Sequence, residues 1–181
     1  ISTSSHKGID RMISKLLKPL AIAGSLVLAL NTSSAFAVSV GDTAPNFKLP
    51  RLERSGDIQL KSYRGKVVYV DFWASWCGPC RLSLPELNKL RKQYRKKGFE
   101  VIAINLDEDK DDAMEFLKEF PVAYPTARDV KGTTPDKYGL QGMPTAYLID
   151  RKGKVSLVHE GFKKTDSAEL KHKIAALLKK K

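Results

Sequence analysis

Cysteine is scarce in this sequence: Cys77 and Cys80 are the only two among 181 residues. A domain held together by several disulfides is therefore excluded, because such domains are rich in cysteine. A bridge between these two positions would close a very short loop and remove little entropy from the unfolded chain. We therefore expect the pair to serve chemistry rather than stability.

Histidine is scarce as well, which argues against a metal site. Beyond residue 37 the chain contains only His159 and His172. These residues and a single CxxC are a poor match for the four ligands of a structural zinc site. Covalent haem attachment needs a histidine directly after the second cysteine, where Arg81 stands instead. We predict no metal and no haem, and interpret both histidines as ordinary surface or packing residues.

Long apolar runs are missing too. The longest, PLAIAGSLVLAL at residues 19–30, is much shorter than the roughly 20 residues that cross a bilayer. A basic stretch from Met12 precedes it and Ala35-Phe36-Ala37 follows, which is the pattern of a cleavable signal peptide. We predict that residues 1–37 are an N-terminal extension and signal peptide, and that residues 38–181 form one periplasmic domain. The alternative is a membrane tether through an uncleaved segment.

Acidic residues are outnumbered: 32 Lys and Arg face 20 Asp and Glu, for a net charge of +12. Without residues 1–37 the counts are 28 and 19, which leaves +9. The basic side chains gather at residues 91, 92, 95–97 and 179–181, and the chain contains no recognised nucleic-acid-binding module. We predict a monomer that does not bind nucleic acid and has a solvated basic face. Docking of this face to anionic headgroups or an acidic partner is the alternative.

Hydrophobic periodicity predicts an α/β domain. Residues 66–73 form a nearly continuous apolar run, typical of a central strand that is covered on both faces. An amphipathic helix is expected from at or near Cys77 to Gly98, followed by a strand at 100–106. This strand, helix and strand order implies a right-handed parallel crossover. Turn-rich residues before 50 and an alternating stretch at 57–60 indicate an N-terminal hairpin.

The second half of the chain is expected to complete a mixed sheet flanked by helices. The periodicity predicts a helix at 109–120, a short strand and a helical turn within 121–142, a hairpin of 145–150 with 154–159, and a last helix from Asp166. No internal repeat or low-complexity tract interrupts this order.

The two cysteines differ in their expected roles. At the junction of a strand and a helix, the positive end of the helix dipole should lower the pKa of Cys77 below the ~8.5 of a free thiol. Cys77 is then the nucleophile, and Cys80, one turn later, resolves the mixed disulfide. Gly78 allows a close turn, and Pro79 is tolerated in a first helical turn.

Asp71 is a carboxyl group inside an apolar strand. Burial would raise its pKa and make it a proton acceptor for Cys80. The alternative is an aspartate at the end of the strand that points to solvent.

The segments DFWASWCGPCR (71–81) and GMPTAYLID (142–150) resemble the thioredoxin superfamily. The segment VGDTAPNFKLP (40–50) resembles exported TlpA/ResA-like oxidoreductases. The resemblance implies a thioredoxin fold with strand order 2-1-3-4, an N-terminal hairpin and an insertion at about 107–140, after the βαβ unit. It implies no cofactor beyond the redox-active Cys77–Cys80 disulfide.

The resemblance also implies several contacts of the site. Met143 and Pro144 would form a cis-proline loop that faces the disulfide and pairs with the substrate backbone. Trp76 would line the exposed rim beside Gly78 and Pro79, with Trp73 beneath it and Gly161 nearby. Two positions depart from the TlpA/ResA-like pattern: many of those proteins have Asn or an apolar residue at the position of Asp71, and Glu at the position of Ser83. A third position departs from thioredoxin, because Ala103 stands where thioredoxin has a lysine that partners the buried aspartate.

The function implied is that of a thiol-disulfide oxidoreductase. A Gly-Pro pair between the cysteines resembles thioredoxin, with a potential of ~-270 mV, rather than periplasmic oxidants near ~-120 mV. We therefore predict a reductase of disulfides in exported proteins, apocytochrome c among the family possibilities, that a membrane-embedded electron donor recharges. An oxidase or isomerase, a thiol peroxidase and a non-enzymatic binding module are the alternatives, although the peroxidase pattern P-x-x-x-[ST]-x-x-C fits neither cysteine.

Overall fold

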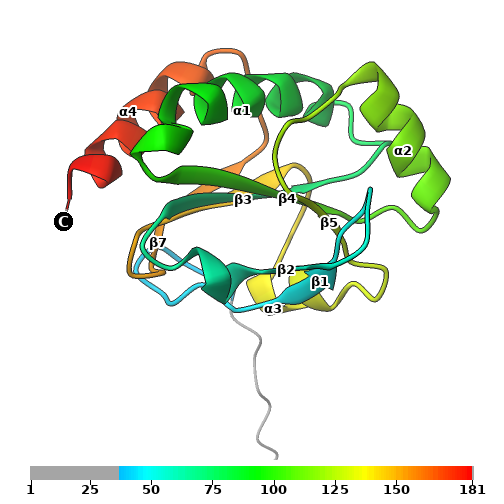
Figure 1. Ribbon diagram of the computed structural model, residues 1–181, viewed down its shortest axis with the longest axis horizontal. Helices are drawn as coiled ribbons and strands as arrows, with labels where there is room; N and C mark the ends of the chain where they lie inside the picture. The colour runs from blue at the N-terminus through cyan, green and yellow to red at the C-terminus, as the bar shows by residue number, and fades with distance from the viewer. Residues whose placement is uncertain (1–36, 181) are drawn as a thin grey trace, which may run out of the picture. The chain divides into compact units, whose positions relative to one another are not determined.

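A computed structural model describes residues 37–180 of the chain (Figure 1). The elements are β1 (Lys48–Pro50), β2 (Asp57–Gln59), the 3₁₀ turn η1 (Leu60–Tyr63), β3 (Val67–Trp73), α1 (Cys80–Tyr94), the 3₁₀ turn η2 (Arg95–Lys97), β4 (Phe99–Asn105), α2 (Lys110–Glu119), β5 (Thr126–Arg128), α3 (Thr133–Tyr138), β6 (Thr145–Ile149), β7 (Val155–Glu160) and α4 (Asp166–Lys179). The predicted signal peptide lies outside the described residues, apart from Ala37.

Five strands form the main sheet in the order β5-β4-β3-β6-β7. The central strand β3 pairs in parallel with β4, through the crossover helix α1, and antiparallel with β6. Strands β4, β3, β6 and β7 therefore reproduce the predicted order 2-1-3-4. The predicted insertion contributes α2, β5 and α3, and β5 extends the sheet by pairing with β4. Strands β1 and β2 form the predicted N-terminal hairpin as a separate sheet.

Both faces of the sheet are covered, which explains why every residue of β3 is buried. Helices α1 and α4 lie on one side, and the hairpin and α3 lie on the other (Figure 1). Because side chains alternate along a strand, Tyr69 and Trp73 join the core under α1 and α4. Val68, Val70 and Phe72 join the core on the hairpin side. The face of Tyr69 and Trp73 is also the face of Asp71.

Helix α1 begins at Cys80, later than the sequence analysis expects. The four residues from Cys77 to Cys80 form a turn instead, closed by the Cys80 amide, which donates to the Cys77 carbonyl at 3.1 Å. Gly98 ends the following η2 turn with a φ of 97°, a left-handed conformation that favours glycine. In the part of the chain from 37 to 180, the structure contains no helix long and apolar enough to cross a membrane.

Candidate active site

Cys77 and Cys80 form a disulfide in the loop that joins β3 to α1. The S–S distance is 2.01 Å and the two Cα atoms are 5.4 Å apart. Cys80 is fully buried as the first residue of α1, and Cys77, in the turn before it, is 3 % exposed. The pair therefore lies at the N-terminal end of a helix, where the helix dipole favours negative charge.

Asp71 is buried on the face of β3 that lies under α1. The side chain is 1 % exposed, so the alternative of a solvent-facing aspartate is wrong. Its neighbours across the sheet are Ala103 on β4 and Ala146 on β6, and its Oδ2 atom has no hydrogen-bond partner among the described residues. Desolvation by burial raises the pKa of Asp71 from 3.8 to about 8. In the register of β3 and β4, Ala103 lies directly opposite Asp71 and offers no charged partner to it.

The two tryptophans have opposite environments. Trp76 is 69 % exposed beside Cys77 and presents the largest apolar surface near the disulfide. Trp73 is fully buried, with its ring centroid 5.3 Å from that of Phe116 on α2. The expected division between an exposed rim and a buried base is therefore present in the structure.

The peptide bond between Met143 and Pro144 is cis, as the resemblance implied. Pro144 precedes β6, and β6 runs antiparallel to β3, so the loop lies at the same edge of the sheet as the residues that follow Trp73. The Pro144 carbonyl accepts a hydrogen bond of 2.8 Å from the amide of Gly161. Gly161 has a φ of 72°, which favours glycine at this position.

Sequence reasoning missed Asp107, which anchors the loop before the cysteines. Its carboxylate accepts hydrogen bonds from the backbone amide of Ser75 at 3.0 and 3.1 Å and from the Ser75 hydroxyl at 2.9 Å. The side-chain amide of Asn105 donates to the same carboxylate at 2.6 Å. The end of β4 is thereby joined to the turn that holds Trp76 and Cys77. No local pattern marks Asp107, because Ser75 is 32 positions away.

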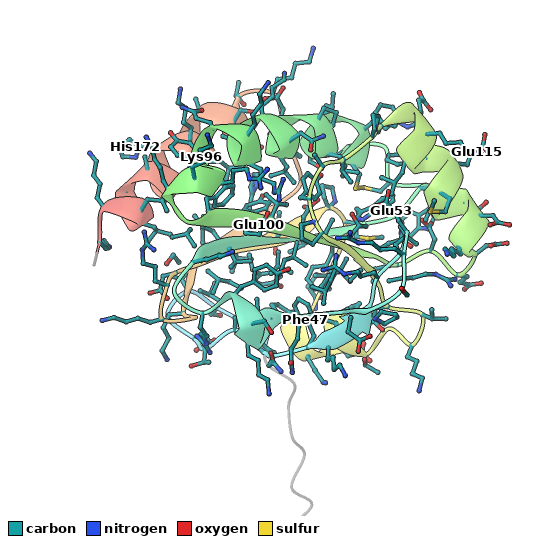
Figure 2. All side chains as sticks on the ribbon, in the orientation of Figure 1. Phe47, Glu53, Lys96, Glu100, Glu115 and His172 are labelled. Carbon is teal, nitrogen blue, oxygen red and sulfur yellow. A yellow bond between two sulfur atoms is a disulfide. The ribbon has the colours of Figure 1, made fainter. Side chains whose placement is uncertain are left out.

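The sequence predicts that His159 is an ordinary surface or packing residue, and the structure gives it a more specific environment. Its side chain is only 15 % exposed, and its two ring nitrogens contact Tyr69 and Asp166. The other histidine, His172, projects from α4 at the outside of the molecule (Figure 2). Among residues 37–180, no three His, Cys, Asp or Glu side chains are grouped so that they could hold a metal ion.

A thioredoxin fold that carries a CxxC disulfide at the start of its first long helix defines the class of thiol-disulfide oxidoreductases. The match to the Redoxin family covers residues 39–174, and the chain belongs to this family and to its ResA-like members. It is 38 % identical over 146 residues to the thiol-disulfide oxidoreductase ResA of Geobacillus thermodenitrificans, covering 81 % of this chain and 83 % of the relative. The ResA of Bacillus cereus is 34 % identical over 149 residues, with coverages of 81 % and 86 %.

Solved structures agree with this assignment. A crystal structure from Chlorobium tepidum, described under the name thiol:disulfide interchange protein DsbE, is 49 % identical with a TM-score of 0.75. The match covers 78 % of this chain and 99 % of that one. The fold, the family and the disulfide together make this protein a thiol-disulfide oxidoreductase, as the sequence analysis predicted.

Proposed function

We propose that the protein reduces disulfides in other proteins, with Cys77 as nucleophile, Cys80 as resolving thiol and Asp71 as proton acceptor. The observation that carries the proposal is a buried carboxyl group of raised pKa on the same core face as the CxxC pair. A group with a pKa near 8 suits proton transfer from a thiol, because acid–base catalysis is most efficient when the pKa lies near the working pH.

In the reduced protein, the Cys77 thiolate attacks one sulfur of the substrate disulfide. The other substrate sulfur leaves as a thiolate and takes a proton from water. The Cys80 sulfur then attacks Cys77 in the mixed disulfide, while its proton passes to the Asp71 carboxylate. The Cys77–Cys80 bond forms, the second substrate sulfur leaves, and two electrons have moved from this protein to the substrate.

The reducing direction is supported by Gly78 and Pro79, the same pair that separates the cysteines of thioredoxin. Thioredoxin has a potential of about -270 mV, well below the about -120 mV of strong periplasmic oxidants. Equilibration of the purified protein with defined glutathione mixtures measures the potential of the couple. A value above about -180 mV would assign the protein to the oxidases or isomerases instead.

Substrate contact is assigned to the surface around the disulfide. Cys77 is preceded in the sequence by Trp76 and followed by Gly78 and Pro79, and the loop of Met143 and Pro144 lies at the same edge of the sheet. Exposed aromatic surface contributes strongly to the binding of polypeptides, and Trp76 supplies it here. This arrangement favours a polypeptide substrate.

The proposal includes a place of action. Residues 1–37 carry the pattern of an export signal, and residues 38–181 would then act as a monomeric periplasmic domain on exported proteins. An oxidising compartment re-oxidises dithiols, so a membrane-embedded electron donor is required to restore Cys77 and Cys80. Tethering through residues 19–30 would keep the domain beside such a donor, and fractionation of cells that express the tagged full chain distinguishes the two forms.

Covalent trapping tests the proposed roles of the cysteines. In Cys80→Ser the mixed disulfide on Cys77 cannot be resolved, so a model peptide with one disulfide should stay attached and be seen by mass spectrometry. Cys77→Ser is the matched control and should trap nothing. If the peptide became attached to Cys80 in Cys77→Ser as fast as to Cys77 in Cys80→Ser, the assignment of Cys77 as the nucleophile would be wrong.

A further inference from the structure

Asp71 and His159 lie in one row across the sheet. Asp71 on β3 is paired with Ala146 on β6, and Ala146 is paired with His159 on β7. Directly paired residues place their side chains on the same face of a sheet. Only the methyl group of Ala146 stands between the carboxyl group and the imidazole in this row, which leaves room for a third side chain.

The third side chain is Tyr69, the neighbour of Asp71 on the same face of β3. Its hydroxyl oxygen lies 2.8 Å from Nδ1 of His159. Burial, and then the negative charge of Asp71, raise the pKa of Tyr69 well above its usual 10.0. The hydroxyl is therefore close enough to Asp71 to sense its charge, although its hydrogen-bond partner is His159.

Asp166 at the start of α4 determines the direction of this hydrogen bond. Its Oδ2 atom lies 3.2 Å from Nε2 of His159 and also accepts the amide of Lys163 at 2.8 Å. A carboxylate only accepts, and a neutral imidazole has one donor and one acceptor nitrogen. In the neutral form of His159, Nε2 therefore carries the hydrogen, and Nδ1 accepts the hydrogen of the Tyr69 hydroxyl.

A second tyrosine near Asp71 is also engaged elsewhere. The Tyr124 hydroxyl donates to the carbonyl of Leu84 on α1 at 3.2 Å. Burial and the charge of Asp71 raise the pKa of Tyr124 as well. Both tyrosine hydroxyl groups whose pKa is raised by the charge of Asp71 are thus hydrogen-bonded to other partners. This matters because each donor to a carboxylate stabilises the charged form and weakens it as a base.

We propose that His159, fixed by Asp166, is a positioning residue that holds the Tyr69 hydroxyl away from Asp71 and so leaves the proton acceptor without a hydrogen-bond donor. The inference rests on the proposed role of Asp71 in the resolution step. It assigns His159 an effect on Asp71 without contact to substrate or to the reacting sulfur atoms.

The elements around this row add no competing charge. The buried residues of α1 are Cys80, Ser83, Leu84, Leu87, Leu90 and Tyr94, and those of α4 are Leu170 and Ile174. The titratable groups of the core cluster on this side of the sheet are Tyr69, Tyr94, Tyr124 and the two cysteines. Those that face His159 are Tyr69 and Asp166, and its remaining ring neighbour is Phe162 at 5.7 Å between centroids.

The test is an NMR titration of the Asp71 carboxyl carbon in the oxidised full chain. In His159→Phe the Tyr69 hydroxyl loses its acceptor and turns to the carboxylate, so the measured pKa of Asp71 should fall by about 1 to 2 pH units. His159→Gln keeps an acceptor and should stay near the wild-type value. The double variant Tyr69→Phe/His159→Phe lacks the hydroxyl and should return toward that value. His172→Phe, on the exposed side of α4, is the matched control.

An unchanged pKa in His159→Phe, or an equal fall in the double variant, would overturn the proposal. His159→Leu makes the same test if the phenylalanine variant does not fold. The titration reports on Asp71 even if this residue has no role in exchange. A pH profile of disulfide exchange that Asp71→Asn leaves unaltered would therefore reject the proposed function alone.

Discussion

The stability of the oxidised protein should depend on pH through Asp71. Burial raises the pKa of this group from 3.8 to about 8, so between these values the folded chain keeps a proton that the unfolded chain has lost. The contribution of Asp71 to the free energy of unfolding is fully present below pH 3.8. It falls by about 1.4 kcal/mol per pH unit above that value and is lost once the pH has risen through about 8. At pH 7, about 3 units above the ordinary pKa, the loss reaches about 4 kcal/mol.

Asp71→Asn removes the titration and nearly preserves the size of the side chain. The free energy of unfolding of the variant should exceed that of the wild type by an amount that grows with pH and levels off above about pH 8. Urea denaturation of both oxidised proteins in steps from about pH 5 to about pH 9 measures this difference. The pH dependence of the difference carries the test, since any packing effect of the amide is constant. A difference that does not change with pH would refute a raised pKa for Asp71.

Three further substitutions test the structure around the disulfide. Asp107→Ala removes the carboxylate that accepts hydrogen bonds from the Ser75 amide, the Ser75 hydroxyl and the Asn105 side-chain amide. Urea denaturation should show that the free energy of unfolding falls by about 2 to 4 kcal/mol. A fall below about 0.5 kcal/mol would contradict the anchoring role. Trp76→Ala should change the free energy of unfolding by no more than about 0.5 kcal/mol, because the ring is exposed. The variant should reduce a protein disulfide several-fold more slowly than the wild type, and a small aromatic disulfide at the wild-type rate. Equal slowing of both substrates would argue against a docking role for Trp76. Leu87→Ala opens a cavity under α1 and should cost about 2 to 5 kcal/mol by the same denaturation assay, whereas a cost below about 1 kcal/mol would mean that the core collapses around the site.

The elements of the fold were predictable where periodicity and burial agree. The apolar run of β3 is covered on both faces, so its composition alone indicates a central strand. The start of α1 was less predictable, because Gly78 and Pro79 allow either a first helical turn or a separate turn. The structure adopts the separate turn, which leaves Cys77 outside the helix and Cys80 as its first residue.

The candidate reacting groups could be selected from the sequence, but the groups that contact and support them could not. The cysteines and Asp71 were found because a CxxC and a carboxyl group in an apolar strand stand out locally. His159 contacts Tyr69, 90 positions away, only through the register of β3, β6 and β7. A histidine at the end of a strand has no local feature that predicts such a partner, so pairing across the sheet had to be known first.

The burial of Cys77 beside an exposed Trp76 has a consequence for selectivity in a mixture of thiols. A small thiol that collides with the surface at random rarely reaches a sulfur atom of the disulfide, because Cys77 is only 3 % exposed. Under the proposed function, a polypeptide that binds against Trp76 would bring its own disulfide to the position from which the Cys77 sulfur can be reached. Electron transfer would then require docking, so the Cys77–Cys80 couple would exchange slowly with small thiols and could keep a potential different from theirs.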